Sequence, residues 1–447
     1  MKRIVLTADN PFDEGMLERA GTFEPEVIAN VSRIIDDVRK RGDEAVREYT
    51  KRFDGLDLDD YRVSEDEIDA AFDAVSEEVV ESLELAAEHI RLFHEQQRRQ
   101  SWFITRDDGA FLGTKVTPIE RVGLYVPGGR ARYPSTVLMD AIPAKVAGVG
   151  RVAMTTPPAS DGRIDATTLV AARIAGVDEV YSIGGAQAIA ALAYGTASIE
   201  RVDKIVGPGN IFVAAAKKLV SGDVGIDMIA GPSEVCILAS RYCTPEFVAI
   251  DLMAQAEHDP QAVCYLISST EELADRIEEL IEEYLPDSPR ADITRTSFET
   301  KGLIFVTDDL EEAVDVANAI APEHLEVHVP EPMALIGELR NAGAIFLGDF
   351  TPTPVGDYVA GPNHTLPTSG TARFSSPLSV DDFVKRSSVV NYTYETLVSD
   401  AEAIKTIATQ EGLWSHARSV ELRLELIEEA LAHMEEHDHD HGAGECC

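Results

Sequence analysis

The chain of 447 residues predicts an α/β protein of two doubly wound, incomplete Rossmann-like domains, one inserted in the other, with N- and C-terminal arms and helices. Its length exceeds that of one ordinary domain. From Arg121 onward, apolar runs of strand length alternate with Ala-rich segments of helix length. This alternation is typical of parallel sheets covered by helices on both faces.

The expected strands form two groups, which set the domain boundaries. The block 126–233 is low in charge and rich in Gly and Ala, and we predict that it is the inserted domain. Residues 23–125 and 234–375 would form the other domain, residues 1–22 an N-terminal arm, and residues 376–447 a C-terminal dimerisation arm with an acidic tail. The predicted strands are 122–126, 152–155, 180–183, 205–206, 235–238, 263–267, 303–306, 325–329 and 344–347.

The composition is strongly acidic, with 79 Asp and Glu against 39 Lys and Arg. The acidic residues are spread along the chain, which argues against a nucleic-acid partner, because phosphate binding requires clusters of Lys and Arg. No apolar run is long enough to cross a bilayer, and the N-terminus lacks the apolar core of a signal peptide. We therefore expect a cytoplasmic protein without a membrane partner.

We interpret the net charge of −40 as an adaptation to high salt, of the haloarchaeal kind. At molar ionic strength, charges are screened over ~3 Å, which removes the repulsion between acidic side chains. We expect the fold, followed by circular dichroism, to be lost at low salt and regained in molar KCl. A signal that does not change with salt would contradict this halophilic interpretation.

Three Gly-bearing turns of the inserted block each follow a predicted strand and precede a helix. They would lie at the carboxyl edge of a sheet, where backbone amides at helix N-termini suit phosphate groups. None has the G-x-G-x-x-G dinucleotide pattern, and the near match at 148–150 precedes a strand. A nucleotide-binding role and a purely structural role are therefore equally well supported for these turns. They are Tyr125–Gly129, Gly184–Gln187 and Gly207–Asn210.

Several polar residues are candidates for a metal site. Gln255 and His258 close an apolar helical run, and their spacing would place them on one helix face. Asp357 lies in a loop rich in Pro and Gly, and His416 lies near the start of the last helix. Singly, each is more often a solvated or capping side chain. Together they form an oxygen and nitrogen ligand set that zinc accepts, and the lack of Cys favours a catalytic over a structural site.

Glu323 and His324 stand side by side just before a predicted strand. An imidazole and a carboxylate at this point offer one base for an alcohol proton and a second base for water.

Eight motifs in chain order resemble those of the histidinol dehydrogenase family. They extend over about residues 25 to 425, and their order is far more specific than any one of them. The motifs are YVPGG from 125, GGAQAIAA from 184, VGPGN from 206, GPSE from 231, AQAEHD from 254, APEHL from 321, GPNH from 361 and EGL from 411.

The resemblance implies oxidation of L-histidinol to L-histidine through the aldehyde, with reduction of two NAD, as the last step of histidine biosynthesis. It implies one Zn²⁺ per subunit that holds the imidazole and amino nitrogens of the substrate. His324 would take the alcohol proton and Glu323 would activate the water. The implied zinc ligands are Gln255, His258, Asp357 and His416.

The resemblance also assigns further binding residues. Ser233, His364 and Glu411 match substrate contacts, in addition to His324 and the zinc ligands, whereas Tyr125, Gln187 and Asn210 match NAD contacts. The family is a homodimer whose C-terminal arm completes the site of the partner, which would place Glu411 and His416 in trans. The chain departs from the family at residues 436–447, a tail with His and Cys that is either disordered or collects zinc.

Other functions compete with this interpretation. Relatives of the family oxidise other amino or sulfonated alcohols, and a non-catalytic zinc- and nucleotide-binding protein is a rival of another class. The presence of both Glu323 and His324 argues against the latter. A zinc hydrolase would need no NAD turns, and NADH formation at 340 nm separates it from a dehydrogenase.

Overall fold

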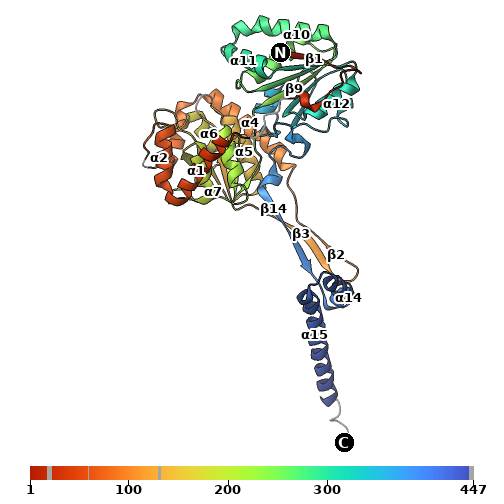
Figure 1. Ribbon diagram of the computed structural model, residues 1–447. Coiled ribbons are helices and arrows are strands. Elements are labelled where there is room, and N and C mark those ends of the chain that lie inside the picture. Colours follow the sequence, from red (N-terminus) through yellow and green to blue (C-terminus); the bar gives the residue numbers. More distant parts are fainter. Residues whose placement is uncertain (18–22, 59, 129–131, 442–447) are drawn as a thin grey trace. The chain divides into compact units, whose positions relative to one another are not determined.

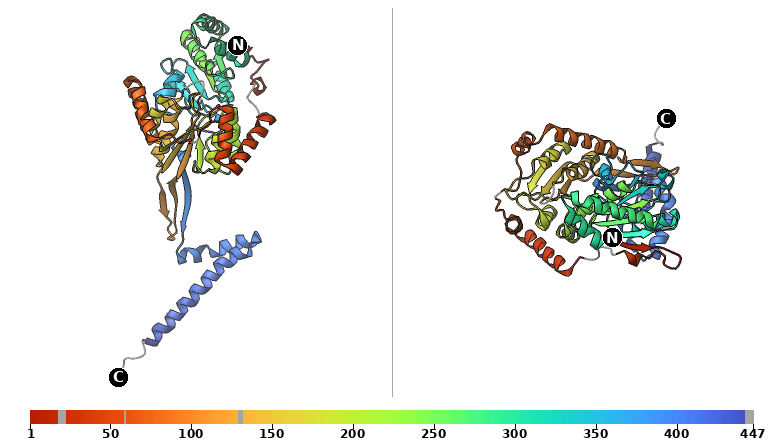
Figure 2. Two further views of the ribbon diagram at one scale, coloured as in Figure 1. Left: turned by 90° about the vertical axis from the view of Figure 1, so that its left-hand side faces the viewer. Right: turned by 90° about the horizontal axis from the view of Figure 1, so that it is seen from above.

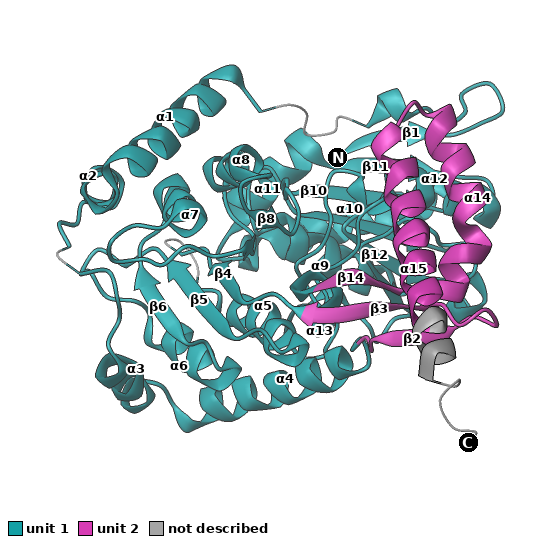
Figure 3. Ribbon diagram, turned by 90° about the horizontal axis from the view of Figure 1, so that it is seen from below, with its two compact units in different colours: residues 1–98, 118–384 teal, residues 99–117, 385–447 magenta. Residues whose placement is uncertain are grey.

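The computed structural model describes residues 1–17, 23–58, 60–128 and 132–441 (Figure 1). The chain forms two compact units, shown in different colours in Figure 3. Unit 1 consists of residues 1–98 and 118–384, and unit 2 of residues 99–117 and 385–447.

Unit 1 contains a five-stranded parallel sheet that starts at a central strand. The chain runs outward from β4 through β5 to β6, then returns to the other side of β4 with β7 and β8. The strand order therefore reverses between β4 and β7, which is where open α/β sheets bind ligands. The elements are β4 (Arg121–Tyr125), α5 (Pro134–Ala147), β5 (Arg151–Thr156), α6 (Ala166–Ala175), β6 (Glu179–Ser182), α7 (Gly185–Tyr194), β7 (Lys204–Val206), α8 (Ile211–Val220) and β8 (Gly225–Ile226).

A six-stranded parallel sheet repeats this plan with the order β1-β11-β10-β9-β12-β13. Here the reversal lies between β9 and β12. Two doubly wound sheets confirm the predicted fold class. The elements are β1 (Lys2–Val5), β9 (Glu234–Ala239), α9 (Pro245–Ala256), β10 (Val263–Ser268), α10 (Glu271–Tyr284), α11 (Ala291–Lys301), β11 (Leu303–Val306), α12 (Leu310–Ile320), β12 (His324–His328), β13 (Ala344–Leu347) and α13 (Thr353–Tyr358).

All nine predicted strands are confirmed to within one residue at each end. Short 3-10 helices lie at Glu14–Met16, Phe72–Ala74, Leu285–Asp287, Pro332–Leu335, Thr371–Arg373 and Val380–Phe383. The near match to a dinucleotide pattern is a helix end, because Gly148 caps α5 in a left-handed conformation before β5 begins.

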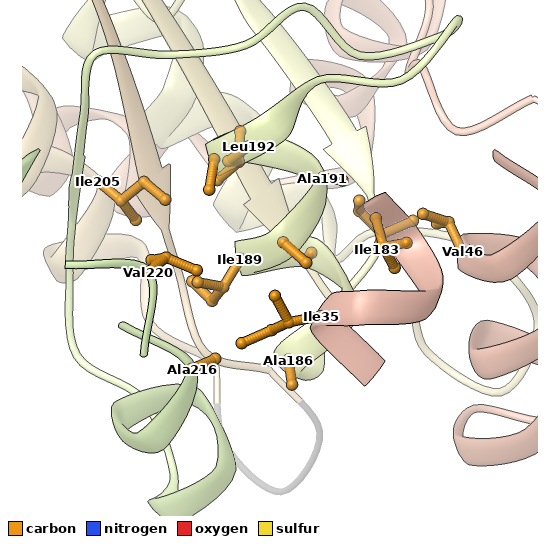
Figure 4. Packing of buried hydrophobic residues seen from close by; sticks show 14 of the residues in the cluster. Ile35, Val46, Ile183, Ala186, Ile189, Ala191, Leu192, Ile205, Ala216 and Val220 are labelled. Carbon is orange, nitrogen blue, oxygen red and sulfur yellow. The ribbon is translucent and has the colours of Figure 1, made fainter. Parts of the chain in front are cut away.

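The N-terminal helices pack differently from the predicted grouping. Residues 23–125 were expected to join 234–375, but α1 (Pro25–Arg41) and α2 (Asp43–Phe53) share a core with α7 and α8 of the five-stranded sheet, as Figure 4 shows. Likewise α3 (Glu65–Ala71) and α4 (Glu77–Glu95) pack on α5 and α6. The predicted N-terminal arm contains β1, which pairs with β11.

The apolar face of α1 explains this packing. Val31, Ile34, Ile35 and Val38 are buried at helical spacing against an Ala-rich helix, which lets the two helices approach closely. In Figure 4, Ile35 lies near Ile189 and Ala186 of α7.

Unit 2 combines a three-stranded sheet with two long helices. The sheet has the order β14-β3-β2, with β2 (Trp102–Thr105), β3 (Phe111–Pro118) and β14 (Val384–Asn391). The helices α14 (Tyr394–Gln410) and α15 (Trp414–His441) pack on each other as a hairpin (Figure 2). The first of these helices was expected from Ala401, but Thr393 caps an earlier start by accepting a hydrogen bond from the Thr396 amide.

Two further expectations concern the C-terminal tail and membrane-spanning helices. Residues 442–447 of the predicted tail lie outside the described residues, as do all side chains from 435 onward. In the described part of the chain, no helix is both long and apolar enough to span a bilayer.

Candidate active site

Glu323 and His324 lie where β12 begins, beside the start of β9. Glu323 Oε2 accepts a hydrogen bond of 2.7 Å from the Glu234 amide, and His324 Nδ1 lies 3.0 Å from the Glu234 carbonyl oxygen. The backbone of one residue therefore orients both side chains. Because Nδ1 faces an acceptor, it carries a proton, and Nε2 is the nitrogen left for chemistry.

His324 Nε2 is buried and has no hydrogen-bond partner among the described residues. It lies 3.6 Å from Asp357 Oδ1, which is the distance of an ion pair and too long for a hydrogen bond. The carboxylate of Glu323 lies 3.6 Å from the other ring nitrogen. The imidazole is thus held between two acids with one nitrogen free.

The charges of this group are strongly coupled. Burial raises the pKa of Glu323 to about 7. Burial lowers the pKa of His324, but the charges of Glu323 and Asp357 outweigh it and raise this pKa to about 9. Burial alone would raise the pKa of Asp357, whereas the adjacent imidazole of His324 brings it below its ordinary value. A cation bound to Asp357 would offset the negative charge of this carboxylate and so lower the pKa of His324.

Three of the four predicted zinc ligands lie in unit 1, namely Gln255, His258 and Asp357. Gln255 is buried in the last turn of α9, and its Nε2 has no partner within the described chain. Burial lowers the pKa of His258, against the effect of the nearby Asp357 carboxylate. A neutral imidazole, a carboxylate and the oxygen of a side-chain amide are ligand types that fit a zinc ion.

Two local expectations about these ligands were wrong. His258 does not share a helix face with Gln255, because α9 ends at Ala256 and the His258 amide bonds the Gln255 carbonyl oxygen in a turn. Pro260 disfavours a helical conformation at Asp259, so the helix does not resume after this turn. Asp357 lies not in a loop but in α13, a short helix with Pro in its first turn.

The predicted substrate residues are placed in part. His364 Nδ1 lies 3.0 Å from the Asp357 carbonyl oxygen, and its Nε2 lies 3.3 Å from Thr136 Oγ1 on α5. Burial lowers the pKa of His364, which favours the neutral ring. Ser233 is half-buried directly before β9. Glu411 and His416 belong to unit 2, where both are exposed.

The predicted NAD residues lie at the carboxyl edge of the five-stranded sheet. Tyr125 ends β4, and its hydroxyl accepts a hydrogen bond of 3.0 Å from the Gly185 amide. Gln187 is buried in the first turn of α7, and its Oε1 is unpartnered within the described residues. Asn210 caps α8, so its amide oxygen is already engaged by the Phe212 and Val213 amides. Gly129 of the first turn lies outside the described residues.

Gly207 fixes the turn after β7. Its φ is +112°, and an added Cβ would lie 2.2 Å from the Tyr125 carbonyl oxygen. Only glycine fits here, because L-residues rarely adopt this conformation. The turn is therefore held close against β4, at the strand-order reversal where a nucleotide would bind.

Sequence reasoning missed a second group of chemical side chains. Asp251, Glu326 and His328 are buried, and their ligand atoms lie within 4.8 Å of one another, so they could hold a metal ion. The available signal was the presence of Glu and His at alternate positions of a strand that is otherwise apolar.

The chain matches a known family. The profile described as histidinol dehydrogenase covers residues 17–424. The chain belongs to the histidinol dehydrogenase family. The histidinol dehydrogenase of Geobacillus kaustophilus is 55% identical over 392 residues, which are 88% of this chain and 92% of that protein. The histidinol dehydrogenase from a Synechococcus strain is 54% identical over 402 residues, or 90% and 93% of the two chains.

A solved structure agrees with this membership. The crystal structure of histidinol dehydrogenase from Elizabethkingia anophelis has a TM-score of 0.90 at 36% identity and covers 96% of this chain and 99% of that one. The relatives named here are bacterial, so they do not support the haloarchaeal origin suggested by the acidic composition. The dependence on salt stays a prediction.

Proposed function

We propose that this chain oxidises L-histidinol to L-histidine through L-histidinaldehyde, with reduction of two NAD, in the cytoplasm. The observation that carries this proposal is the buried pair Glu323 and His324, with His324 Nε2 unpartnered beside Asp357. A pair of coupled bases suits a reaction in which an alcohol and then a hydrated aldehyde must each lose a proton.

His324 acts as the base for the alcohol. Its Nδ1 proton points at the Glu234 carbonyl oxygen, so the form of the ring that is unprotonated at Nε2 accepts the hydroxyl proton while hydride leaves the alcohol carbon for NAD. Glu323, with a pKa of about 7, exists in both protonation states near neutral pH and takes a proton from the water that adds to the aldehyde. The second hydride then leaves the hydrated aldehyde and the acid remains.

Gln255, His258 and Asp357, with His416 supplied by a partner subunit, would hold one Zn²⁺. When bound, zinc would anchor the imidazole and amino nitrogens of the substrate. NAD, held near Tyr125, Gln187 and Asn210, would accept each hydride. Ser233, His364 and Glu411 would contact the substrate, so the aldehyde stays in place while the first NADH is exchanged.

A dehydrogenase of another amino or sulfonated alcohol is the second candidate. The same base pair would serve it, and only the substrate contacts would differ. Glu411 and the hydrogen-bonded His364, whose pKa is lowered by burial, favour an imidazole-bearing substrate.

The proposal is tested by the yield of NADH. With limiting L-histidinol, excess NAD and added zinc in molar KCl, we expect two NADH per histidinol at 340 nm, lost on chelation and restored by zinc. Glu323→Gln is expected to stop at one NADH, because the aldehyde is no longer hydrated at the site. One NADH from the wild type would contradict the role of Glu323. Turnover of another amino alcohol without turnover of histidinol would overturn the substrate.

A further inference from the structure

Four ionisable side chains lie nearer the carboxyl edge of the six-stranded sheet than the active-site residues do, and they take no part in the proposed reaction. They are Asp251, Glu326, His328 and Asp349, called here the Glu326 cluster. His328 Nε2 lies 3.2 Å from Glu326 Oε2 and 3.9 Å from Asp251 Oδ2, while His328 Nδ1 lies 3.1 Å from Asp349 Oδ1. Glu326 and His328 are each 1% exposed.

A fifth residue ties the cluster to α13. The backbone amide and the hydroxyl of Thr353 both donate to Glu326 Oε1, each at 2.7 Å. Thr353 is the first residue of α13 and is buried. Glu326 therefore holds the start of this helix through two hydrogen bonds that a charged acceptor strengthens.

Three of these five residues lie one structural period from an active-site residue. Asp251 precedes Gln255 by one turn of α9, and Thr353 precedes Asp357 by one turn of α13. Glu326 follows His324 by two residues, so both side chains point to the same face of β12. The cluster thus meets all three elements of unit 1 that carry the base and the proposed zinc ligands near it.

We propose that the Glu326 cluster and Thr353 are positioning residues that set the separation of α9, β12 and α13 and so the geometry of the zinc ligands. This inference rests on the proposed function. The cluster acts through Gln255, His324 and Asp357, without touching the substrate.

Stability alone does not explain the cluster. Burial of charged pairs costs about as much as their attraction returns, and apolar side chains of similar size often stabilise a protein equally well. Burial and the Glu326 charge raise the pKa of Asp251 to about 7. Hydrogen bonds from His328 and Thr353 outweigh burial and keep the pKa of Glu326 below its ordinary value. The structure retains a costly arrangement at the point where three functional elements meet.

A second metal site is the competing account. The ligand atoms are close enough for one ion. However, both ring nitrogens of His328 already face carboxylates and Glu326 Oε1 already accepts two bonds, so the polar atoms are satisfied by the protein itself. The geometry therefore favours a role in positioning α9, β12 and α13 over a second metal site.

The test measures zinc release from the zinc-loaded, full-length enzyme into a colorimetric chelator. Thr353→Val removes one of the two bonds to Glu326 at nearly constant volume, and Glu326→Gln removes the charge that pairs with His328. Loss of support behind metal ligands typically weakens binding 10- to 100-fold, so we expect release about 10-fold faster in either variant. Thr353→Ser keeps the hydroxyl and should restore the wild-type rate.

Ser268→Ala is the matched control. Ser268 is fully buried at the far end of β10, and its hydroxyl makes one bond, to the Thr270 carbonyl oxygen. This variant should lose stability in thermal unfolding as Thr353→Val does, but with unchanged zinc release. Equal zinc release in Thr353→Val, Ser268→Ala and wild type would overturn the positioning role.

Two further outcomes are decisive. Two zinc ions per wild-type subunit, falling to one in Glu326→Gln, would overturn the positioning role in favour of a metal site in the cluster. A wild type that binds no zinc and forms no NADH from histidinol would instead refute the proposed function on which the inference rests.

Discussion

Replacement of His324 by Gln is expected to lower the rate of NADH formation about 10³-fold, within the range for loss of a general base. Gln is close in size and can still donate to the Glu234 carbonyl oxygen, which now orients Nδ1 of the ring. It has no basic nitrogen to place where Nε2 stands. The rate is measured at saturating histidinol and NAD, with zinc content determined on the same sample.

A buried histidine elsewhere in unit 1 provides the control. His94 is fully buried in α4, where its Nδ1 lies 2.8 Å from the Ile90 carbonyl oxygen. His94→Gln should reduce the midpoint of thermal unfolding and leave the rate close to that of the wild type. If the two substitutions slowed the reaction equally, the effect at His324 would be structural and its role as base would be refuted.

The sheets were predictable because strands buried on both faces must be almost wholly apolar. β9 and β10 are such runs, and every residue in them is buried. Which sheet a helix covers is a different matter. The apolar stripe of α1 indicates that one face of the helix is buried, but a periodic pattern does not identify the element against which it packs. The grouping of residues 23–125 failed for this reason.

The local conformation around the predicted site residues was harder to predict than the sheets. Gln255 and His258 were assigned to one helix face, although α9 ends between them. The cluster around Glu326 was missed because its members come from α9, β12 and the segment after β13, and only the fold brings them together. The local sequence gives one indication of this cluster: Glu326 and His328 alternate with Leu325 and Val327 in a strand that is buried throughout.

Unit 2 exposes an apolar surface that a single chain would not be expected to leave in water. The side chains of Trp414 and Ile407 are 74% and 61% exposed, and those of Val390 and Trp102 are 67% and 56% exposed. Large exposed apolar patches mark protein–protein interfaces, and these four large side chains belong to one small unit. Together with the exposed His416, they support the proposal that unit 2 completes the active site of a second subunit.

A heterodimer of two inactive chains is expected to recover about half of the wild-type activity, since a symmetric dimer has two equivalent sites. One chain carries His258→Ala and the other His416→Ala, each with its own affinity tag, and the mixed dimer is purified after co-expression. If His416 serves the partner, one of the two sites receives both substitutions and the other receives neither. The intact site then binds zinc and forms NADH at the normal rate.

The homodimers of each variant are the controls, and both should be inactive, because each lacks one of the four proposed zinc ligands at every site. If His416 instead served its own chain, both sites of the mixed dimer would carry one defect and no activity would return. Zinc content distinguishes the same cases without turnover: one ion per mixed dimer supports exchange of the C-terminal arm, and none contradicts it.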